Sequence, residues 1–261
     1  SLQMVGESIG DVGIYTVEEL EHYDEALQLK SEALGDKHTE VADTLYTMGC
    51  HHQRFQRFTF AQKCYEQALG IYKAQLGYDN PRVSRVLHNI GVMYHAKNES
   101  DVAMKCFQKS LSIRRATLGD DDISLAESYC WIGNINRERE EFDAARESFV
   151  TSHRIKALVL GKDHPECAEI LHNIGVVCDD LGLYSESLTS FREALVIRRA
   201  QVSSAYDANE MKDICDTLNC IGNVYRAKMD RKRALHFFEE SIKRRAKIVS
   251  TTLSDNSQVS I

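Results

Sequence analysis

The chain has 261 residues, a formal net charge of −7, two prolines, fourteen glycines and 27% charged residues. This composition is typical of a helical protein, and the negative charge disfavours a nucleic-acid binder, which needs a basic surface. No run of 18 apolar residues and no signal-peptide pattern is present, so we predict no membrane span and no membrane partner.

Regularly spaced glycines organise the sequence. Two sets of residues share a step of 42: Gly49, Gly91, Gly133 and Gly175, and the Leu-Gly pairs that end at Gly35, Gly77, Gly119 and Gly161. A fixed period of this size indicates stacked supersecondary units rather than one globular core.

The predicted elements follow this period along the chain. An N-terminal segment, 1–15, is either partly disordered or added during cloning, and a lone helix of an incomplete unit follows within 16–35. Five full units are predicted at about 38–77, 80–119, 122–161, 164–203 and 211–248, so the repeat array covers 16–248. A polar C-terminal tail, 249–261, is expected to be disordered from Ser250.

Each unit contains two amphipathic helices. Around Gly91, apolar residues recur at helical spacing from Val83 to Tyr94 and predict a helix A, and a polar turn then leads into a helix B. A glycine inside a helix costs about 1 kcal/mol relative to alanine, so its recurrence predicts close approach to helix B. Aromatic residues recur on helix B as core residues: Tyr65, Phe107, Phe149, Phe191 and Phe238.

The last step breaks the period. Gly175 and Gly222 are 47 residues apart, because five residues are inserted within Gln201–Lys212. We predict a longer loop or a helix extension there, which is either a partner contact or a neutral insertion, since loops tolerate added length.

The unit resembles the tetratricopeptide repeat, through Leu87, Gly91 and Tyr94 on helix A and Ala103, Phe107 and Ser110 on helix B. The 42-residue period and the linker from Leu160 to Pro165 resemble the kinesin light chain-like type. The resemblance implies an all-α, right-handed α-solenoid of stacked helix-turn-helix repeats, with roughly eleven helices and a concave groove lined by the A helices.

The sequence offers no catalytic constellation. It contains no phosphate-loop, dinucleotide-binding, nucleophile-elbow or HExxH motif, and the histidines lie far apart along the repeats. The eight cysteines include no CxxC pair. We therefore predict no enzyme, no cofactor and no metal site, and reduced thiols in a cytoplasmic, reducing compartment.

In the tetratricopeptide family, groove residues lie at fixed positions relative to the helix-A glycine. Carried onto this chain, these positions predict a peptide-binding groove: Arg85, His88, Asn89, Glu127, Trp131, Asn134, Glu169, His172, Asn173, Asp216, Asn219 and Asn223. A carboxamide both donates and accepts hydrogen bonds, so the asparagines can hold a peptide backbone. Alternatively, they bond to neighbouring helices or to water.

Two further features bear on the partner. Trp131, the only tryptophan, is either an interface anchor or a core residue. Glu127, Glu169 and Asp216 make the later part of the groove acidic, which predicts Lys or Arg in the bound segment. The family's carboxylate clamp for chaperone C-termini needs several Lys and Arg residues, but only Arg85 stands at its positions, which argues against that function.

The leading hypothesis is a non-enzymatic scaffold that binds a short peptide segment of a protein partner in this groove. Three alternatives remain open: a structural subunit that docks by its convex or end surfaces, a ligand-sensing repeat region of a truncated multidomain signalling protein, and the cargo-binding domain of a kinesin light chain. The last requires a heptad coiled coil upstream, and residues 1–20 show none. Self-association is also possible, with an apolar end face such as Val12, Ile14, Tyr15 and Val17 capped by a second copy.

Overall fold

The computed structural model describes residues 20–201 and 208–258. These residues form helices joined by short turns, with no strand among them, so the predicted all-α class is confirmed. The helices belong to two compact units, one ending at Gly119 and the other beginning at Asp120, and each unit is described on its own.

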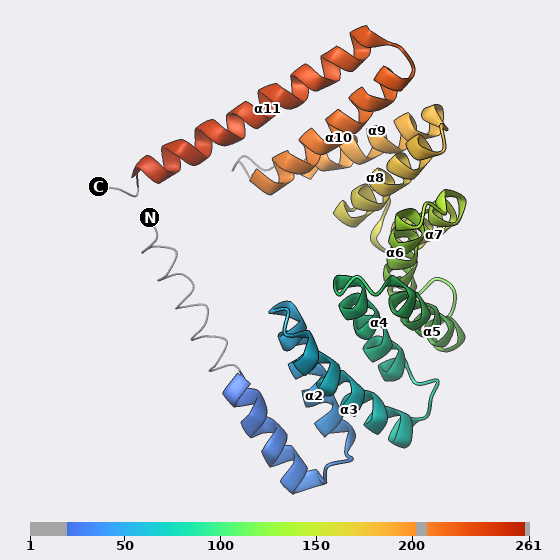
Figure 1. Ribbon diagram of the computed structural model, residues 1–261, viewed down its shortest axis with the longest axis vertical. Coiled ribbons are helices and arrows are strands. Elements are labelled where there is room, and N and C mark those ends of the chain that lie inside the picture. Colours follow the sequence, from blue (N-terminus) through green and yellow to red (C-terminus); the bar gives the residue numbers. More distant parts are fainter. Residues whose placement is uncertain (1–19, 202–207, 259–261) are drawn as a thin grey trace. The chain divides into compact units, whose positions relative to one another are not determined.

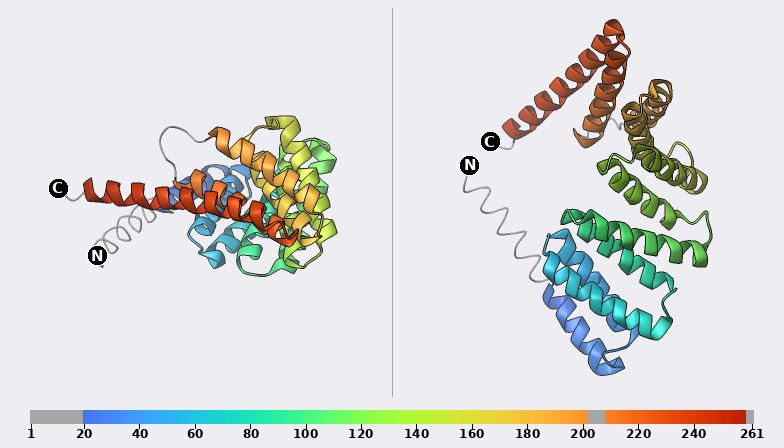
Figure 2. Two further views of the ribbon diagram at one scale, coloured as in Figure 1. Left: turned by 90° about the horizontal axis from the view of Figure 1, so that it is seen from above. Right: turned by 45° about the vertical axis from the view of Figure 1, so that its right-hand side comes forward.

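Both units are built from consecutive helix pairs (Figure 1; two further views in Figure 2). The N-terminal unit contains a helix over residues 20–34, α2 (Thr39–Arg54), α3 (Phe58–Leu76), α4 (Pro81–Ala96) and α5 (Ser100–Leu118). The C-terminal unit contains α6 (Ile123–Glu138), α7 (Phe142–Leu160), α8 (Pro165–Asp180), α9 (Tyr184–Gln201), α10 (Ala208–Ala227) and α11 (Arg231–Gln258). Even-numbered helices are the predicted A helices, and each packs on the B helix that follows it.

Local signals fix where the helices begin and end. The A helices α2, α4, α6 and α8 begin after N-cap residues whose side chains accept a backbone N–H: His38, Asn80, Asp122 and His164. The B helices end at Gly77, Gly119 and Gly161, with φ of 88°, 87° and 93° and an extended ψ. Only glycine adopts this combination readily, which explains the recurring Leu-Gly pair.

A glycine on helix A meets an aromatic ring on helix B in every pair. A Cβ atom placed on Gly91 would lie 2.9 Å from Phe107 Cε1, and the corresponding closest distances in the other four pairs are 2.5–2.8 Å. The rings of Tyr65, Phe107 and Phe149 are fully buried. The predicted close approach of the two helices is therefore present, and the side chain that occupies the missing Cβ volume is the aromatic residue of the same repeat.

Small residues of helix B complete the contact. The hydroxyl of Ser110 donates to the Ser84 carbonyl at 2.8 Å, and Ser152 donates to the Ala126 carbonyl at 2.7 Å. In both cases, the buried hydroxyl reaches a backbone carbonyl of the paired A helix, so the two helices are joined by a hydrogen bond as well as by packing.

The insertion lengthens an A helix. The other A helices begin ten residues before their glycine, whereas α10 begins at Ala208, fourteen residues before Gly222. About one extra turn of helix therefore absorbs most of the inserted length. Residues 202–207 lie outside the described residues.

The C-terminal helix is longer than the sequence predicted. α11 continues to Gln258, through residues 250–258, where a disordered tail was expected. The physical reason is that no proline or glycine interrupts the sequence from Arg231 to Gln258, so the helix has no internal breaker. Residues 259–261 lie outside the described part.

We expect Gly91→Ala to destabilise the protein by about 1–2 kcal/mol. The added methyl group overpacks the Phe107 ring, at a cost of about 1–3 kcal/mol, and the gain in helix propensity offsets only part of this. The measurement is the urea midpoint of unfolding, followed by circular dichroism.

Gly70→Ala is the matched control. Gly70 lies inside α3, and a Cβ atom there would meet nothing within 4 Å, so alanine is expected to stabilise the helix by about 1 kcal/mol. If both substitutions shift the midpoint in the same direction, the close glycine–aromatic contact does not determine the stability of the repeat.

Candidate peptide-binding face

The predicted groove residues lie on four A helices. Three of them are on α4 in the N-terminal unit: Arg85, His88 and Asn89. The other nine are on α6, α8 and α10 in the C-terminal unit: Glu127, Trp131, Asn134, Glu169, His172, Asn173, Asp216, Asn219 and Asn223. We call the surface formed by these positions the helix-A face, and we describe it separately in each unit.

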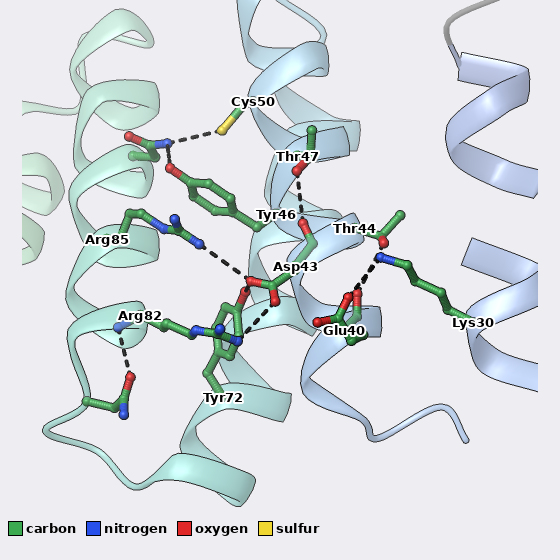
Figure 3. Close-up of polar contacts among 12 residues, drawn as sticks. Lys30, Glu40, Asp43, Thr44, Tyr46, Thr47, Cys50, Tyr72, Arg82 and Arg85 are labelled. Atoms are coloured by element: carbon green, nitrogen blue, oxygen red, sulfur yellow. Dashed lines mark hydrogen bonds and ion pairs between the residues drawn. The ribbon is translucent and has the colours of Figure 1, made fainter. Parts of the chain in front are cut away.

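In the N-terminal unit, Asp43 of α2 is the centre of a polar network (Figure 3). Its carboxylate accepts hydrogen bonds from Tyr72 Oη at 2.5 Å and from Arg82 Nη1 at 3.0 Å, and Arg85 Nη2 lies 3.5 Å away. Two arginines therefore share one carboxylate, which leaves the cluster with a net positive charge.

Arg85 and Asn89 connect α4 to α2. The Arg85 guanidinium lies over the Tyr46 ring, 4.3 Å from its centroid, in a cation–π arrangement. Asn89 Nδ2 donates to Tyr46 Oη at 2.8 Å and lies 3.2 Å from Cys50 Sγ. Burial raises the pKa of Tyr46, so its hydroxyl stays protonated. For Asn89, the structure shows hydrogen bonds to a neighbouring helix, the alternative that the sequence left open.

The other four predicted asparagines differ from Asn89. Asn134, Asn173, Asn219 and Asn223 are half-buried, and their side chains make no hydrogen bond to any residue in the part of the chain that the structure describes. Each carboxamide therefore has its donors and its acceptor available to water or to a ligand.

The two predicted histidines pack against the aromatic rings of their repeats. His88 is 7% exposed, and its ring centroid lies 5.3 Å from that of Phe107. His172 is half-buried, also 5.3 Å from the ring of Phe191. His88 thus contributes to the interior of its repeat rather than to an open groove, because its position on helix A points toward helix B.

Burial keeps both imidazoles neutral. The pKa of His88 falls to about 4, mainly through burial and also through Arg114. The pKa of His172 also falls to about 4, for which burial is the largest cause and Arg198 the next. Arg198 Nη1 reaches over from α9, lies 3.5 Å from His172 Nδ1 and donates to the Asp213 carbonyl of α10 at 2.9 Å.

The helix-A face of the C-terminal unit is acidic. Glu127 and Glu169 are exposed, and Asp216 pairs with Arg245 at 2.7 Å. The pKa of Cys130 rises to about 11, first through burial and then through Glu169. Burial likewise raises the pKa of Cys220 to about 11, with Asp216 the next cause. Both thiols therefore stay protonated, and the carboxylates supply the charge of this surface.

Trp131 is half-buried on α6, so it fits neither a fully exposed anchor nor a fully buried core residue. It stands at the helix position that Asn89 and Asn173 occupy in their repeats. A half-buried indole at that position leaves part of its surface available for contact with a partner.

Several polar residues of the B helices, which were not predicted from the sequence, extend toward the A helices. Tyr72 contacts Asp43, and Arg198 contacts His172 and Thr217. Lys156 is 7% exposed and pairs with Glu166 at 2.7 Å. The available signal was the 42-residue register, which aligns these polar residues at a position where an amphipathic helix would place an apolar one: Tyr72, Arg114, Lys156 and Arg198.

The described residues offer no metal site, since no group of three or more His, Cys, Asp or Glu side chains comes together in them. All eight cysteines are free thiols. None of the helices in the described ranges combines the length and the apolar character needed to cross a membrane.

Paired antiparallel helices, a glycine–aromatic contact in each pair and a polar helix-A face define an α-solenoid repeat protein. Two family models, both described as tetratricopeptide repeat, match residues 20–74, 50–116 and 124–200, and residues 214–255. The chain belongs to the tetratricopeptide repeat family, as the sequence predicted.

Solved structures share this fold. BtubC (BKLC) from P. vanneervenii has a TM-score of 0.77 at 17% identity, covering 89% of this chain and 90% of that one. A putative kinesin light chain with nearly identical TPR-like repeats from Podosopora anserina has a TM-score of 0.67 at 17% identity, covering 80% and 97%. The apo form of RapI has a TM-score of 0.61 at 16% identity, covering 90% and 93%. Among curated proteins, no match is found.

We expect protonation of His88 to destabilise the N-terminal unit. Its folded pKa of about 4 lies below the unfolded value of 6.5, so the stabilisation is complete above pH 6.5 and is lost as the pH falls toward 4. A shift of this size corresponds to about 3 kcal/mol. His88→Leu should therefore flatten the dependence of unfolding free energy on pH between pH 7 and pH 4.5, measured by urea unfolding.

Val86→Ala serves as the control, because it removes buried apolar volume from the same helix without changing a titratable group. It should lower stability equally at every pH. A His88→Leu curve parallel to that of the wild type would contradict a neutral, buried His88.

Proposed function

We propose that this protein is a non-enzymatic scaffold that binds a short peptide segment of a protein partner on its helix-A face. The observation that carries the proposal is the set of four half-buried asparagines without a hydrogen-bond partner among the described residues: Asn134, Asn173, Asn219 and Asn223. A half-buried carboxamide without a hydrogen bond costs free energy. Four of them on one face therefore favour a role in binding a ligand.

The repetition of these amides supports a peptide as the ligand. Asn134 and Asn223 occupy the same position of their repeats, one residue after the helix-A glycine, and Asn173 lies two residues before its own. Amides on successive A helices can donate to and accept from a peptide backbone, whose N–H and C=O groups recur along its length. Such contacts are independent of the peptide's side chains.

The charge of the face supports a bound segment that contains Lys or Arg. Glu127 on α6 and Glu169 on α8 are both exposed, so their carboxylates give this face negative charge at its surface. Basic side chains of a peptide would lie near these carboxylates, which sets specificity and association rate more than affinity.

The eight free thiols favour a reducing compartment, and on that basis we place the protein in the cytoplasm. The predicted self-association surface around Val12 and Val17 lies outside the described residues.

We expect the triple substitution Asn134→Ala/Asn173→Ala/Asn223→Ala to weaken peptide binding at least tenfold. Each lost hydrogen bond removes about 0.5–1.5 kcal/mol, and three together exceed a tenfold change in affinity. The probe is a set of 12-residue peptides selected on the wild-type protein from a random phage-displayed library, with affinities measured by fluorescence anisotropy.

The control is Gln67→Ala/Gln108→Ala, which removes two exposed amides from the B helices α3 and α5 and should leave affinity unchanged. Peptide binding that survives the triple substitution, while circular dichroism shows intact helices, would reject the helix-A face and favour docking by another surface.

The selected peptides should also be enriched in Lys and Arg. Glu127→Gln/Glu169→Gln is expected to weaken their binding roughly threefold to tenfold at low salt, and less at high salt, because exposed ion pairs contribute about 0.2–1 kcal/mol each. Glu147→Gln/Glu193→Gln, on α7 and α9, is the charge-matched control. An equal loss in both variants would assign the effect to net charge rather than to this face.

A further inference from the structure

The outer side of α11 exposes two large apolar residues. Leu235 is 59% exposed and Ile242 is 65% exposed. They are seven residues apart, so they lie on the same side of the helix, two turns from each other. Ala246 continues this line and is also exposed. This surface is distinct from the helix-A face, because α11 is a B helix.

The equivalent positions of α9 show how such an apolar pair is covered by a following helix. Leu188 and Leu195 of α9 stand at the same distances from Gly175 as Leu235 and Ile242 do from Gly222. They are only 7% and 5% exposed, because they pack in one apolar cluster with residues of α10: Met211, Ile214 and Leu218. In α9 the apolar side of α10 covers this pair of positions. In α11 no described helix covers the equivalent pair.

Positive charges border the apolar pair on α11. Arg231, Lys232 and Lys243 are exposed, and none forms an ion pair with a described residue. At about 100° per residue, Arg231 lies on one side of the Leu235–Ile242 line and the two lysines on the other. The neighbouring Arg245, in contrast, pairs with Asp216 of α10.

Arg231 and Lys232 are specific to α11, whereas a cation at the position of Lys243 also occurs in α7, as Arg154. The equivalent residues of α9 are Tyr184, Ser185 and Val196, all uncharged. Position 239, between the two apolar residues, holds the exposed Glu239. The outer face of α11 thus has the same kind of apolar pair that contacts a helix in α9, with cations on both sides of it.

We propose that the outer face of α11 binds an acidic amphipathic helix of a protein partner. The apolar residues of that helix, spaced i, i+3 and i+7 as in α10, cover Leu235 and Ile242, and its carboxylates pair with Arg231, Lys232 and Lys243. A second copy of α11 fits less well, because two such faces would bring like charges together. A membrane also fits less well, because Glu239 interrupts the apolar line.

The test uses two synthetic peptides with the sequence of residues 208–227. The acidic peptide carries Lys212→Glu and Arg226→Glu, and the basic peptide carries Asp213→Lys and Asp216→Lys, so both keep the apolar positions of α10. Their affinities for the full chain are measured by fluorescence anisotropy. The acidic peptide should bind at least tenfold more tightly than the basic one at low salt, and this preference should shrink at high salt.

Two variants of the chain change this surface: the first removes the apolar side chains and adds negative charge, and the second reverses the charges at its border. Leu235→Asp/Ile242→Asp should weaken binding of the acidic peptide at least tenfold. Arg231→Glu/Lys232→Glu/Lys243→Glu should reverse the preference, so that the basic peptide binds more tightly. All substituted side chains are exposed, and unchanged circular dichroism spectra and unfolding temperatures verify that the variants fold.

Leu158→Asp/Val159→Asp is the matched control, since it places the same charges at exposed apolar positions of α7. It should leave the affinity unchanged. Equal binding of the two peptides, or binding that persists in Leu235→Asp/Ile242→Asp, would overturn the proposal. Binding of phosphatidylcholine–phosphatidylserine vesicles to the unsubstituted chain but not to Leu235→Asp/Ile242→Asp, with no binding of either peptide, would overturn the proposal in favour of a membrane surface.

Discussion

The contact between a helix-A glycine and a helix-B aromatic ring is the constraint on which each repeat depends. Because the glycine has no Cβ atom, the ring of Tyr65, Phe107, Phe149 or Phe191 lies directly against the backbone of the paired helix. The ring then fixes both the separation and the rotation of helix A. Once that rotation is set, the residues two positions before the glycine and one after it lie at the edge of the pair, whereas His88 and His172, three positions before, turn toward the ring.

The same constraint gives neighbouring positions of helix A different chemistry. His88, three residues before its glycine, turns toward the Phe107 ring and becomes a buried, neutral imidazole. Asn89, the next residue, turns toward α2 and bonds to Tyr46. In the C-terminal unit the asparagines of α6, α8 and α10 find no such partner among the described residues. The same side of helix A therefore has an internally bonded amide in one unit and amides without a partner among the described residues in the other.

Stacking also explains why the outer side of α11 stands out. A B helix inside the array is covered on one side by its own A helix and on the other by the next one, as α9 is by α8 and α10. Leu188 and Leu195 are buried because α10 covers them, whereas Leu235 and Ile242 are exposed because no described helix covers them. The cations beside this exposed apolar pair favour an acidic partner, and the repeat pattern does not by itself place cations there.

The sequence by itself determined the family, the helix pairs and the close approach at each glycine, because these depend on residues at fixed local spacing. It also placed Asn134 and Asn173 on the predicted groove side of their two A helices. Only the tertiary structure decided that Asn89 bonds to Tyr46, 43 residues away, and that Tyr72 and Arg198 reach across from B helices. Hydrogen-bond partners depend on distances between side chains of different helices, whereas periodicity reports only which side of its own helix a residue occupies.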